Sequence, residues 1–398
     1  MRMSKIVQFS LALLMVVALL AVSGMTIGCP GPKSAVTEWD IPFISVLTGP
    51  AAFAGLPAVW GAEYAADLIN ADGGINGVPV KFTTYDTAFD NAKAVTAMGR
   101  AVEGSLVVFG PMDGNGAPAA GPVAVEAGVP FIAALTRADL REQFAPWGVS
   151  YMQDDADGMP LAVTEWLKLN PDIKSIALFY YPADPTGADT YNELRDTLPE
   201  LGVELLGTIE VASGELDMGP AVVKAMNLNA DGYYCELRAG EYARVATEMY
   251  TRGMTEGRRL CSAFAAFSPE LFDLAEGYLD GTYIWNKMDV NYPSDAWAAL
   301  VEVYKADYDG KSPSIAPVVG YCNAVYAVKV AFETLDITGD PAKLVEERTK
   351  IANFFFNSQE FEGIQGNFHW VEGEFTAPFF FFKIQDNAPV KLSDITVE

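Results

Sequence analysis

Histidine and positive charge are both scarce in this sequence. The 398 residues include one histidine, His369, and only 26 lysines and arginines against 52 aspartates and glutamates, which gives a formal net charge of -26. A single histidine excludes a histidine-rich metal site and argues against a His-based catalytic triad. A nucleic-acid partner needs a clustered basic surface, and the sequence has no basic run that could form one. An anionic membrane surface would also repel the protein.

Cysteine is scarce as well. Of the four cysteines, Cys29 lies near the N-terminus and Cys235, Cys261 and Cys322 lie far along the chain, with no CxxC spacing of the kind that binds metals. Cys235 and Cys261 each end an apolar, strand-like run, so they could lie on neighbouring strands. They are either buried free thiols, which act as small hydrophobic side chains, or a disulfide, which an extracytoplasmic compartment would permit.

Long apolar runs are confined to the N-terminus. Residues 9–22 are nearly all apolar, with Arg2 and Lys5 before them and small residues after them. The run is shorter than the roughly 20 residues of a membrane-spanning helix. The pattern therefore predicts a signal peptide over residues 1–28 and a mature protein outside the cytoplasm.

Cys29 and a short tether over residues 29–39 follow the signal peptide. The cysteine at this place resembles a bacterial lipoprotein cleavage site, although Thr26 stands where that pattern usually has leucine. Cys29 is therefore either lipidated, giving a periplasmic or other extracytoplasmic protein with a lipid as its only membrane attachment, or part of a plainly secreted chain. The third alternative is that the apolar run is retained as an anchor.

Strand-like and helix-like runs alternate along the rest of the chain, which is 51% hydrophobic overall and can form a core. Strands are expected at 41–47, 78–85, 106–110 and 130–135, with helices at 58–69, 91–102 and 117–127. The rhythm then begins again, with strands at 175–181, 203–210, 232–235, 259–263 and 281–285, and helices at 161–169, 189–198, 220–228 and 242–252. A helical region over 297–335 and a β-like tail over 363–390 complete the chain. This alternation predicts an α/β protein of two lobes, each a doubly wound, mainly parallel sheet.

The loops that follow the strands are the candidate binding site, because ligands of open parallel sheets bind outside the carboxyl ends of the strands. The loop at 111–116 contains Gly114 and Asn115 and leads into a helix. Its glycines allow a ligand to approach the backbone, and the helix N-terminus favours an anion. An ordinary glycine-rich turn would have the same sequence.

Charged residues also follow the predicted strands. Arg137 could form a bidentate pair with a ligand carboxylate, or a surface pair with Asp139 or Glu142. Glu236 could accept a ligand ammonium, and Arg238, two residues later, could hold a second acidic group; alternatively the two neutralise each other.

Aromatic side chains near the same loops could line a cleft. Phe53, Tyr181 and Phe264 are candidates, together with Tyr151 and Tyr180, and would suit an apolar or ring-bearing ligand. Each could equally be part of the core.

Several motifs resemble the leucine/isoleucine/valine-binding family of periplasmic, type I substrate-binding proteins of ABC transporters. They are Thr-Gly-Pro-Ala-Ala-Phe-Ala-Gly at 48–55, Gly-Ala-Glu at 61–63, Ile-Asn-Ala-Asp-Gly-Gly-Ile-Asn-Gly at 69–77, Tyr-Asp-Thr-Ala-Phe-Asp at 85–90 and Gly-Asn-Phe-His-Trp at 366–370. The resemblance spans about residues 40 to 390 and is densest over 45–110.

The resemblance implies two Rossmann-like lobes joined by a three-segment hinge, with the ligand cleft between them. Lobe 1 would comprise residues 40–153 and 286–375, and lobe 2 residues 154–285 and 376–398. Many members of the family carry a disulfide where this sequence has Phe89 and Asp113, so that bridge is absent.

The resemblance also implies a set of ligand contacts. The ligand carboxylate would be held by the loop containing Asp113, Gly114 and Asn115, by Thr136 and by the backbone of Ala134. Asp154, at the first crossover, would be an acidic ligand contact or else part of a solvated hinge.

Together these features predict a non-enzymatic binding protein, with no metal or cofactor, that captures a small carboxylate-bearing ligand by closure of its lobes. A branched-chain or other apolar amino acid is the leading ligand; amides, urea-like compounds and aromatic acids are the alternatives. The implied partners are the permease subunits of an ABC importer, and the chain is expected to be monomeric. A sensory ligand-binding protein, or a hydrolase with paired carboxylates, are the competing interpretations, although no nucleophile or cofactor motif accompanies the carboxylates.

Overall fold

The computed structural model describes residues 36–396, except 50, 183, 184 and 358. The predicted signal peptide, Cys29 and most of the tether lie outside the described residues. None of the helices in the described ranges is long and apolar enough to cross a membrane.

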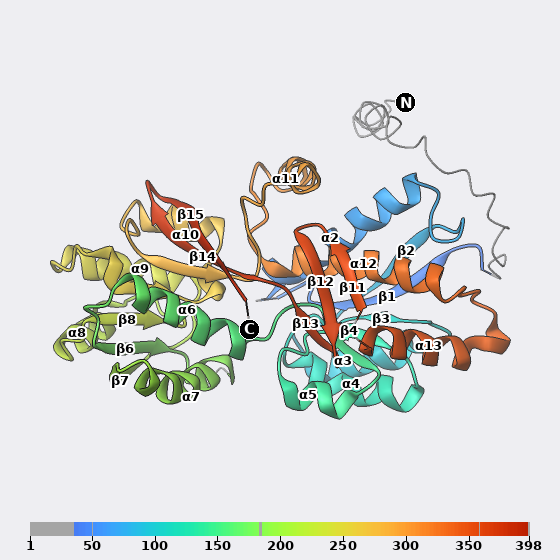
Figure 1. The fold of residues 1–398 in the computed structure, drawn as a ribbon, viewed down its shortest axis with the longest axis horizontal. Helices are drawn as coiled ribbons and strands as arrows, with labels where there is room; N and C mark the ends of the chain where they lie inside the picture. Colours follow the sequence, from blue (N-terminus) through green and yellow to red (C-terminus); the bar gives the residue numbers. More distant parts are fainter. Residues whose placement is uncertain (1–35, 50, 183–184, 358, 397–398) are drawn as a thin grey trace. The chain divides into compact units, whose positions relative to one another are not determined.

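The first lobe is built on a five-stranded parallel sheet in the order β2-β1-β3-β4-β5 (Figure 1). Its elements along the chain are β1 (Trp39–Ser45), α2 (Ala52–Ala71), β2 (Val80–Asp86), α3 (Asn91–Ala101), β3 (Val108–Phe109), α4 (Gly116–Ala127), β4 (Phe131–Ala133), α5 (Ala138–Phe144) and β5 (Gly148–Ser150). β3 and β4 are apolar without interruption because they are buried on both faces, as a parallel sheet between helices requires.

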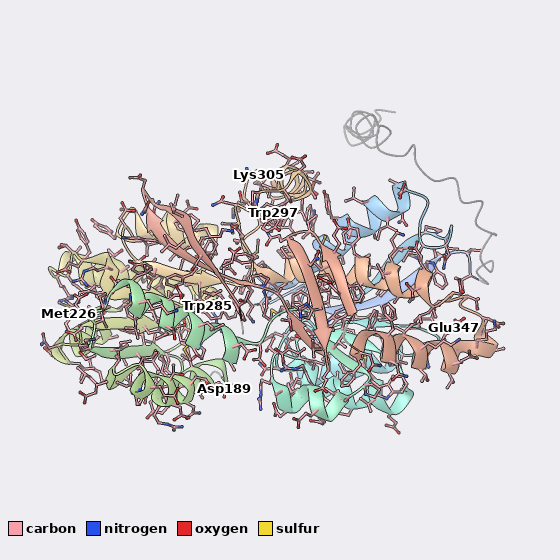
Figure 2. The ribbon with its side chains drawn as sticks, in the orientation of Figure 1. Asp189, Met226, Trp285, Trp297, Lys305 and Glu347 are labelled. Atoms are coloured by element: carbon pink, nitrogen blue, oxygen red, sulfur yellow. The ribbon has the colours of Figure 1, made fainter. Side chains whose placement is uncertain are left out.

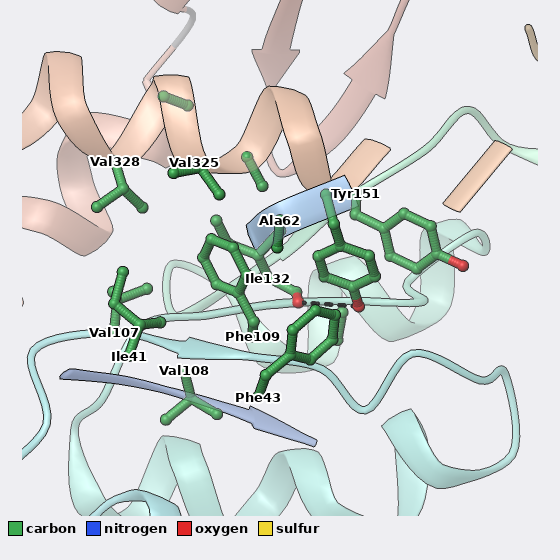
Figure 3. Packing of buried hydrophobic residues seen from close by; sticks show 14 of the residues in the cluster. Ile41, Phe43, Ala62, Val107, Val108, Phe109, Ile132, Tyr151, Val325 and Val328 are labelled. Carbon is green, nitrogen blue, oxygen red and sulfur yellow. Dashed lines mark hydrogen bonds between the residues drawn. The ribbon is translucent and has the colours of Figure 1, made fainter. Parts of the chain in front are cut away.

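A second pass of the chain completes this lobe. The predicted helical region at 297–335 forms two helices, α11 (Asp295–Asp307) and α12 (Ala316–Thr334). α12 packs closely on α2 because Gly61 has no side chain: a Cβ there would lie 2.3 Å from the carbonyl oxygen of Val318. In the core between α12 and the five-stranded sheet, Val325 of α12 projects toward Phe109 of the sheet (Figure 3).

A small antiparallel sheet packs against the same lobe. It follows α13 (Leu344–Phe356) and consists of β11 (Gln359–Gly363), β12 (Gly366–Val371) and β13 (Glu374–Thr376). The indole of Trp370 is fully buried, and its Nε1 donates a hydrogen bond of 2.6 Å to the carbonyl oxygen of Ser150. His369 pairs in register with Glu360 on the adjacent strand of this sheet.

The second lobe contains a seven-stranded sheet in the order β15-β14-β10-β9-β8-β6-β7. Its elements are α6 (Asp155–Leu169), β6 (Ser175–Tyr180), α7 (Pro185–Glu200), β7 (Glu204–Glu210), α8 (Gly219–Asn227), β8 (Gly232–Cys235), α9 (Ala239–Thr251), β9 (Leu260–Ser262), α10 (Pro269–Ala275), β10 (Tyr283–Asn286), β14 (Phe379–Gln385) and β15 (Ala388–Ile395). β6 to β10 are parallel, whereas β14 and β15 add antiparallel strands at one edge. The predicted two-lobe α/β fold is confirmed.

Cys235 and Cys261 lie on neighbouring strands but are not bridged. In the register of β8 and β9, Cys261 pairs with Tyr234 and Cys235 pairs with Ser262. Because alternate residues of a strand face opposite sides of the sheet, the two thiols belong to different hydrophobic clusters. The disulfide alternative is therefore wrong, and both residues are buried free thiols.

The chain crosses between the two large sheets three times, between β5 and α6, between β10 and α11, and between β13 and β14. Gln153 ties these crossovers together. Its side-chain Nε2 donates hydrogen bonds to the carbonyl oxygens of Lys287 (3.2 Å) and Pro378 (2.8 Å). In return, the buried Nζ of Lys287 donates to the carbonyl oxygen of Gln153 at 2.7 Å. All three segments are thus held at one residue.

Candidate functional site

A cleft of about 840 Å³ lies between the two lobes. The first lobe contributes residues from the loops after β2, β3 and β4, from α5 and from β13, and the second lobe contributes residues from the starts of α6 and α7. Asp189, near the start of α7, is one of the residues that line the cleft, and it is labelled in Figure 2. A second cavity, beside Gln153 and Lys287, measures only about 20 Å³ and is too small for an amino acid.

The loop after β3 lines the cleft through Gly114 and Asn115, as predicted, but its helix N-terminus already binds a carboxylate. Oδ1 of Asp113 accepts hydrogen bonds from the backbone amides of Asn115 (3.2 Å) and Gly116 (2.7 Å). Burial raises the pKa of Asp113, and these hydrogen bonds act against the rise. The Asn115 and Gly116 amides, before and at the start of α4, are therefore engaged by the chain itself.

The loop after β4 brings Ala134, Thr136 and Arg137 to the same cleft. Ala134 is buried and its amide donates to the carbonyl oxygen of Pro111, whereas Thr136 is half-buried. Arg137 forms the surface pair that was the alternative to a ligand contact. Its Nε and Nη2 donate to the two carboxylate oxygens of Asp139 at 3.1 and 2.7 Å.

Arg141 is a site residue that the sequence analysis did not single out. It lies on α5, where its side chain is buried. Nη1 lies 2.9 Å from Oδ2 of Asp154, and Nη2 lies 3.0 Å from Oε2 of Glu374. Asp154, which was expected to be a ligand contact, lines the cleft and also caps α6 by accepting from the Ala156 amide. The spacing of Leu140, Arg141 and Phe144 on one helical face was the only signal in the sequence for this burial.

Asp157 lies one helical turn after Asp154 and also lines the cleft. Burial raises the pKa of Asp157 from its ordinary value of 3.8 to about 6, and the nearby charges of Asp154 and Glu374 add to the rise. A hydrogen bond with the Glu374 carboxyl acts in the same direction, against the attraction of Arg141. Asp157 therefore binds a proton more readily than an ordinary aspartate.

Glu236 and Arg238 follow β8 as expected but do not point the same way. Glu236 is buried, and its Oε2 accepts a hydrogen bond of 3.1 Å from Oγ1 of Thr190, which lines the cleft. The guanidinium of Arg238 lies over the ring of Tyr181 at 5.2 Å and also contacts the Ser213 hydroxyl. Glu236 thus reaches the cleft wall through Thr190, whereas Arg238 packs elsewhere in its lobe.

None of the five aromatic candidates, Tyr151 and Tyr180 included, lines the cleft. Phe53 is 62% exposed on α2. Tyr181 is buried, with its hydroxyl accepting a hydrogen bond from the Arg238 amide. Phe264 packs against Trp285, with Nζ of Lys287 4.6 Å above its ring.

Phe89 is the aromatic residue that does line the cleft. Its backbone has φ +61°, next to Ala88 at +48°, conformations that are unusual for residues other than glycine. Asp86 stabilises this turn by accepting hydrogen bonds from the amides of Leu47, Thr48 and Ala88. No pattern in the sequence predicts left-handed backbone at an alanine and a phenylalanine.

A two-lobed α/β architecture with a cleft between lobes and a three-segment hinge defines a binding protein that closes around its ligand. The model of the periplasmic binding protein family matches residues 38–389, and the chain belongs to that family.

Relatives of known name or structure agree with this assignment. An "amino acid binding protein" of Pseudomonas aeruginosa is 27% identical over 295 residues, which cover 72% of this chain and 75% of the relative. A leucine binding protein from Thermotoga maritima superposes with a TM-score of 0.75 at 21% identity, covering 90% of this chain and 98% of that one.

Two solved structures with bound ligands share the fold. A branched-chain amino acid transporter substrate-binding protein of Streptococcus pneumoniae, in complex with isoleucine, has a TM-score of 0.76 at 18% identity, covering 90% of this chain and all of that one. A solute-binding protein of R. palustris, in complex with benzoate, has a TM-score of 0.74 at 16% identity, covering 91% of this chain and 98% of that one. At these identities the likeness concerns the fold.

Proposed function

We propose that this chain is the extracytoplasmic substrate-binding protein of an ABC importer, that it captures an amino acid by closure of its two lobes, and that it catalyses no reaction. The observation that carries the proposal is the cleft between the lobes, lined by strand-end loops of the first lobe and by α6 and α7 of the second. Membership of the periplasmic binding protein family and the 27% identical amino acid binding protein support it.

The contacts proposed for the two ends of an amino acid lie on different walls of the cleft. The side chain of Thr136 and the backbone near Gly114 are the proposed donors to the α-carboxylate. Asp154 and Asp157, with Glu236 behind Thr190, are the proposed acceptors for the ammonium group. A ligand that contacts both lobes favours the closed state, because it binds that state more tightly than the open one.

The chain's location and boundaries belong to the same proposal. Residues 1–28 act as a signal peptide, Cys29 carries a lipid, and the mature protein delivers its ligand to permease subunits as a monomer. Residues 40–153 with 286–375, and 154–285 with 376–398, are the two lobes; the composition of the two large sheets supports these boundaries.

A thermal-shift screen of the mature chain tests the function. Probes are neutral and charged L-amino acids, their deaminated analogues, acetamide, urea and benzoate. An amino acid at about 100 times its Kd should add about 2.7 kcal/mol to the free energy of unfolding. Stabilisation by an amino acid and not by its deaminated analogue supports the proposal. A response to benzoate or urea alone, or to no probe, contradicts it.

A further inference from the structure

The charges that line the cleft are strongly unbalanced. Arg137 and Arg141 are its two basic residues. Against them stand six carboxylates, those of Asp139, Asp154, Asp157, Asp189, Glu193 and Glu374. A zwitterionic amino acid with an apolar side chain has no net charge and leaves this excess unchanged.

Both arginines of the cleft, and two backbone amides before and at the start of α4, are already engaged by carboxylates of the chain. Arg137 is paired with Asp139 through two hydrogen bonds. Arg141 is paired with Asp154 and Glu374. The amides at the start of α4 are bound to Asp113. An additional acidic group on the ligand would therefore have to displace one of these internal pairs.

The remaining carboxylates have no such neutralising partner among the described residues. Asp157 shares a hydrogen bond with another carboxyl, that of Glu374. Asp189 and Glu193 both line the cleft from α7, four residues apart, where like charges repel each other. Arg195, the arginine of α7, donates its hydrogen bonds to Asp196 and Asn192 instead.

A metal ion is a poorer explanation for this excess than an organic cation. Nowhere in the described ranges do three or more aspartate, glutamate, histidine or cysteine side chains gather as a metal site. Asp157, Asp189 and Glu193 are instead spread along α6 and α7, on a wall of an 840 Å³ cleft that has room for an extended molecule.

We infer that the cleft selects an amino acid with a positively charged side chain, such as an ammonium or guanidinium group, over one with an apolar side chain. The α-carboxylate lies at the Thr136 wall, the α-ammonium near Asp154 and Asp157, and the side-chain cation at Asp189 and Glu193 on α7. This assignment rests on the proposed function and specifies the ligand class of the same cleft.

Calorimetric titration with L-lysine, L-norleucine and cadaverine tests the assignment. L-Norleucine has the length of lysine without its side-chain amine, and cadaverine has both amines without the carboxylate. L-Lysine should bind at least about tenfold more tightly than either analogue. The preference for lysine over norleucine should be smaller in about 1 M salt, because the Debye length there is only ~3 Å and charge–charge attraction is screened.

Two double variants of α7 locate the effect. Asp189→Asn with Glu193→Gln should reduce lysine binding by about tenfold or more and leave norleucine binding unchanged. Asp196→Asn with Glu200→Gln makes the same change in net charge on the same helix outside the cleft, and should change neither.

The outcomes separate this inference from the proposed function. Norleucine or leucine binding as tightly as lysine overturns the inference and leaves the proposed function standing. Cadaverine binding as tightly as lysine overturns the assignment to an amino acid. Equal effects of the two double variants overturn the role of α7, and a chain that binds no amino acid refutes the proposed function itself. The comparison of lysine with norleucine on the unmodified chain remains decisive if a variant fails to fold.

Discussion

Arg141 and Asp154 form a buried ion pair, 2.9 Å apart, that joins α5 of the first lobe to the start of α6 in the second. Both side chains are only 7% exposed, and Arg141 also holds Glu374 on β13. The pair therefore lies at the wall of the cleft and at the first crossover between lobes.

Removing Arg141 should destabilise the protein strongly. Arg141→Ala leaves the buried carboxylate of Asp154 without its partner, at a cost of about 3–5 kcal/mol. Urea denaturation measures the loss in the free energy of unfolding. Arg137→Ala is the matched control: it breaks the exposed pair with Asp139, whose side chains are 54% and 62% accessible, and should cost only about 0–1 kcal/mol. Equal costs for the two variants would mean that burial of the Arg141 pair has no effect on stability.

Thr136→Ala should weaken binding of an α-amino acid by about 1–2 kcal/mol, because it removes a hydrogen bond to the ligand carboxylate. Titration calorimetry with the best ligand of the screen measures the loss. Thr96→Ala, on the exposed face of α3, is the control and should bind normally. Normal binding by Thr136→Ala would remove this residue from the site.

Glu236→Gln should weaken binding of an amino acid and leave binding of its deaminated analogue unchanged. Glu236 accepts a hydrogen bond from Thr190, which lines the cleft. Its negative charge therefore attracts the ligand ammonium either from behind Thr190 or in direct contact. Equal losses for both ligands, measured by calorimetry, would exclude an effect on the ammonium group.

Asp157 should make the protein less stable as the pH rises from about 4 to 6. Its pKa is about 6 when folded, against 3.8 ordinarily, so the folded state binds more protons than the unfolded state within this window. Protonated Asp157 therefore stabilises the folded state fully below pH 3.8, its ordinary pKa. This stabilisation is lost as the pH rises past about 6, its pKa in the folded protein. Asp157→Asn should flatten the pH dependence of the melting temperature in this range. An unchanged profile in the variant would show that another group titrates there.

Reducing agent should leave the melting temperature unchanged, because the three cysteines of the described ranges are free and buried. Burial raises the pKa of the Cys235 and Cys261 thiols, which further lowers their reactivity. The Cys235→Ser and Cys261→Ser variants should both melt below the wild type for loss of packing, independently of reductant. A drop of many degrees with reductant alone would indicate a disulfide, since losing one costs about 2–5 kcal/mol.

The alternation of apolar and amphipathic runs predicted the parallel parts of the two large sheets, because strands buried on both faces are continuously apolar. β8 was predicted at its observed bounds, Gly232–Cys235, and α3 within one residue. α5, β5 and α10 were missed, because elements of three to seven residues are too short to show a period. The 13-residue helix α13 was missed as well.

The lining of the cleft was predicted best where it follows from topology. Gly114, Asn115, Ala134 and Thr136 line the cleft because they end neighbouring parallel strands. Phe53 was chosen for its chemistry, but α2 begins just before it and turns its ring toward solvent. The pair of Arg141 with Glu374 joins residues 233 positions apart, and no local pattern contains that information.

The hydrogen bonds of Gln153 bear on how the cleft opens. Bending one crossover alone would break a bond to Lys287 or Pro378 at a residue that is only 4% exposed, where water is a poor substitute. The motion of lowest energy is one in which the three crossover segments twist together about Gln153. Opening is then a rigid-body rotation of one lobe about a single point. A ligand bound to one lobe therefore meets the same face of the other lobe at every closure.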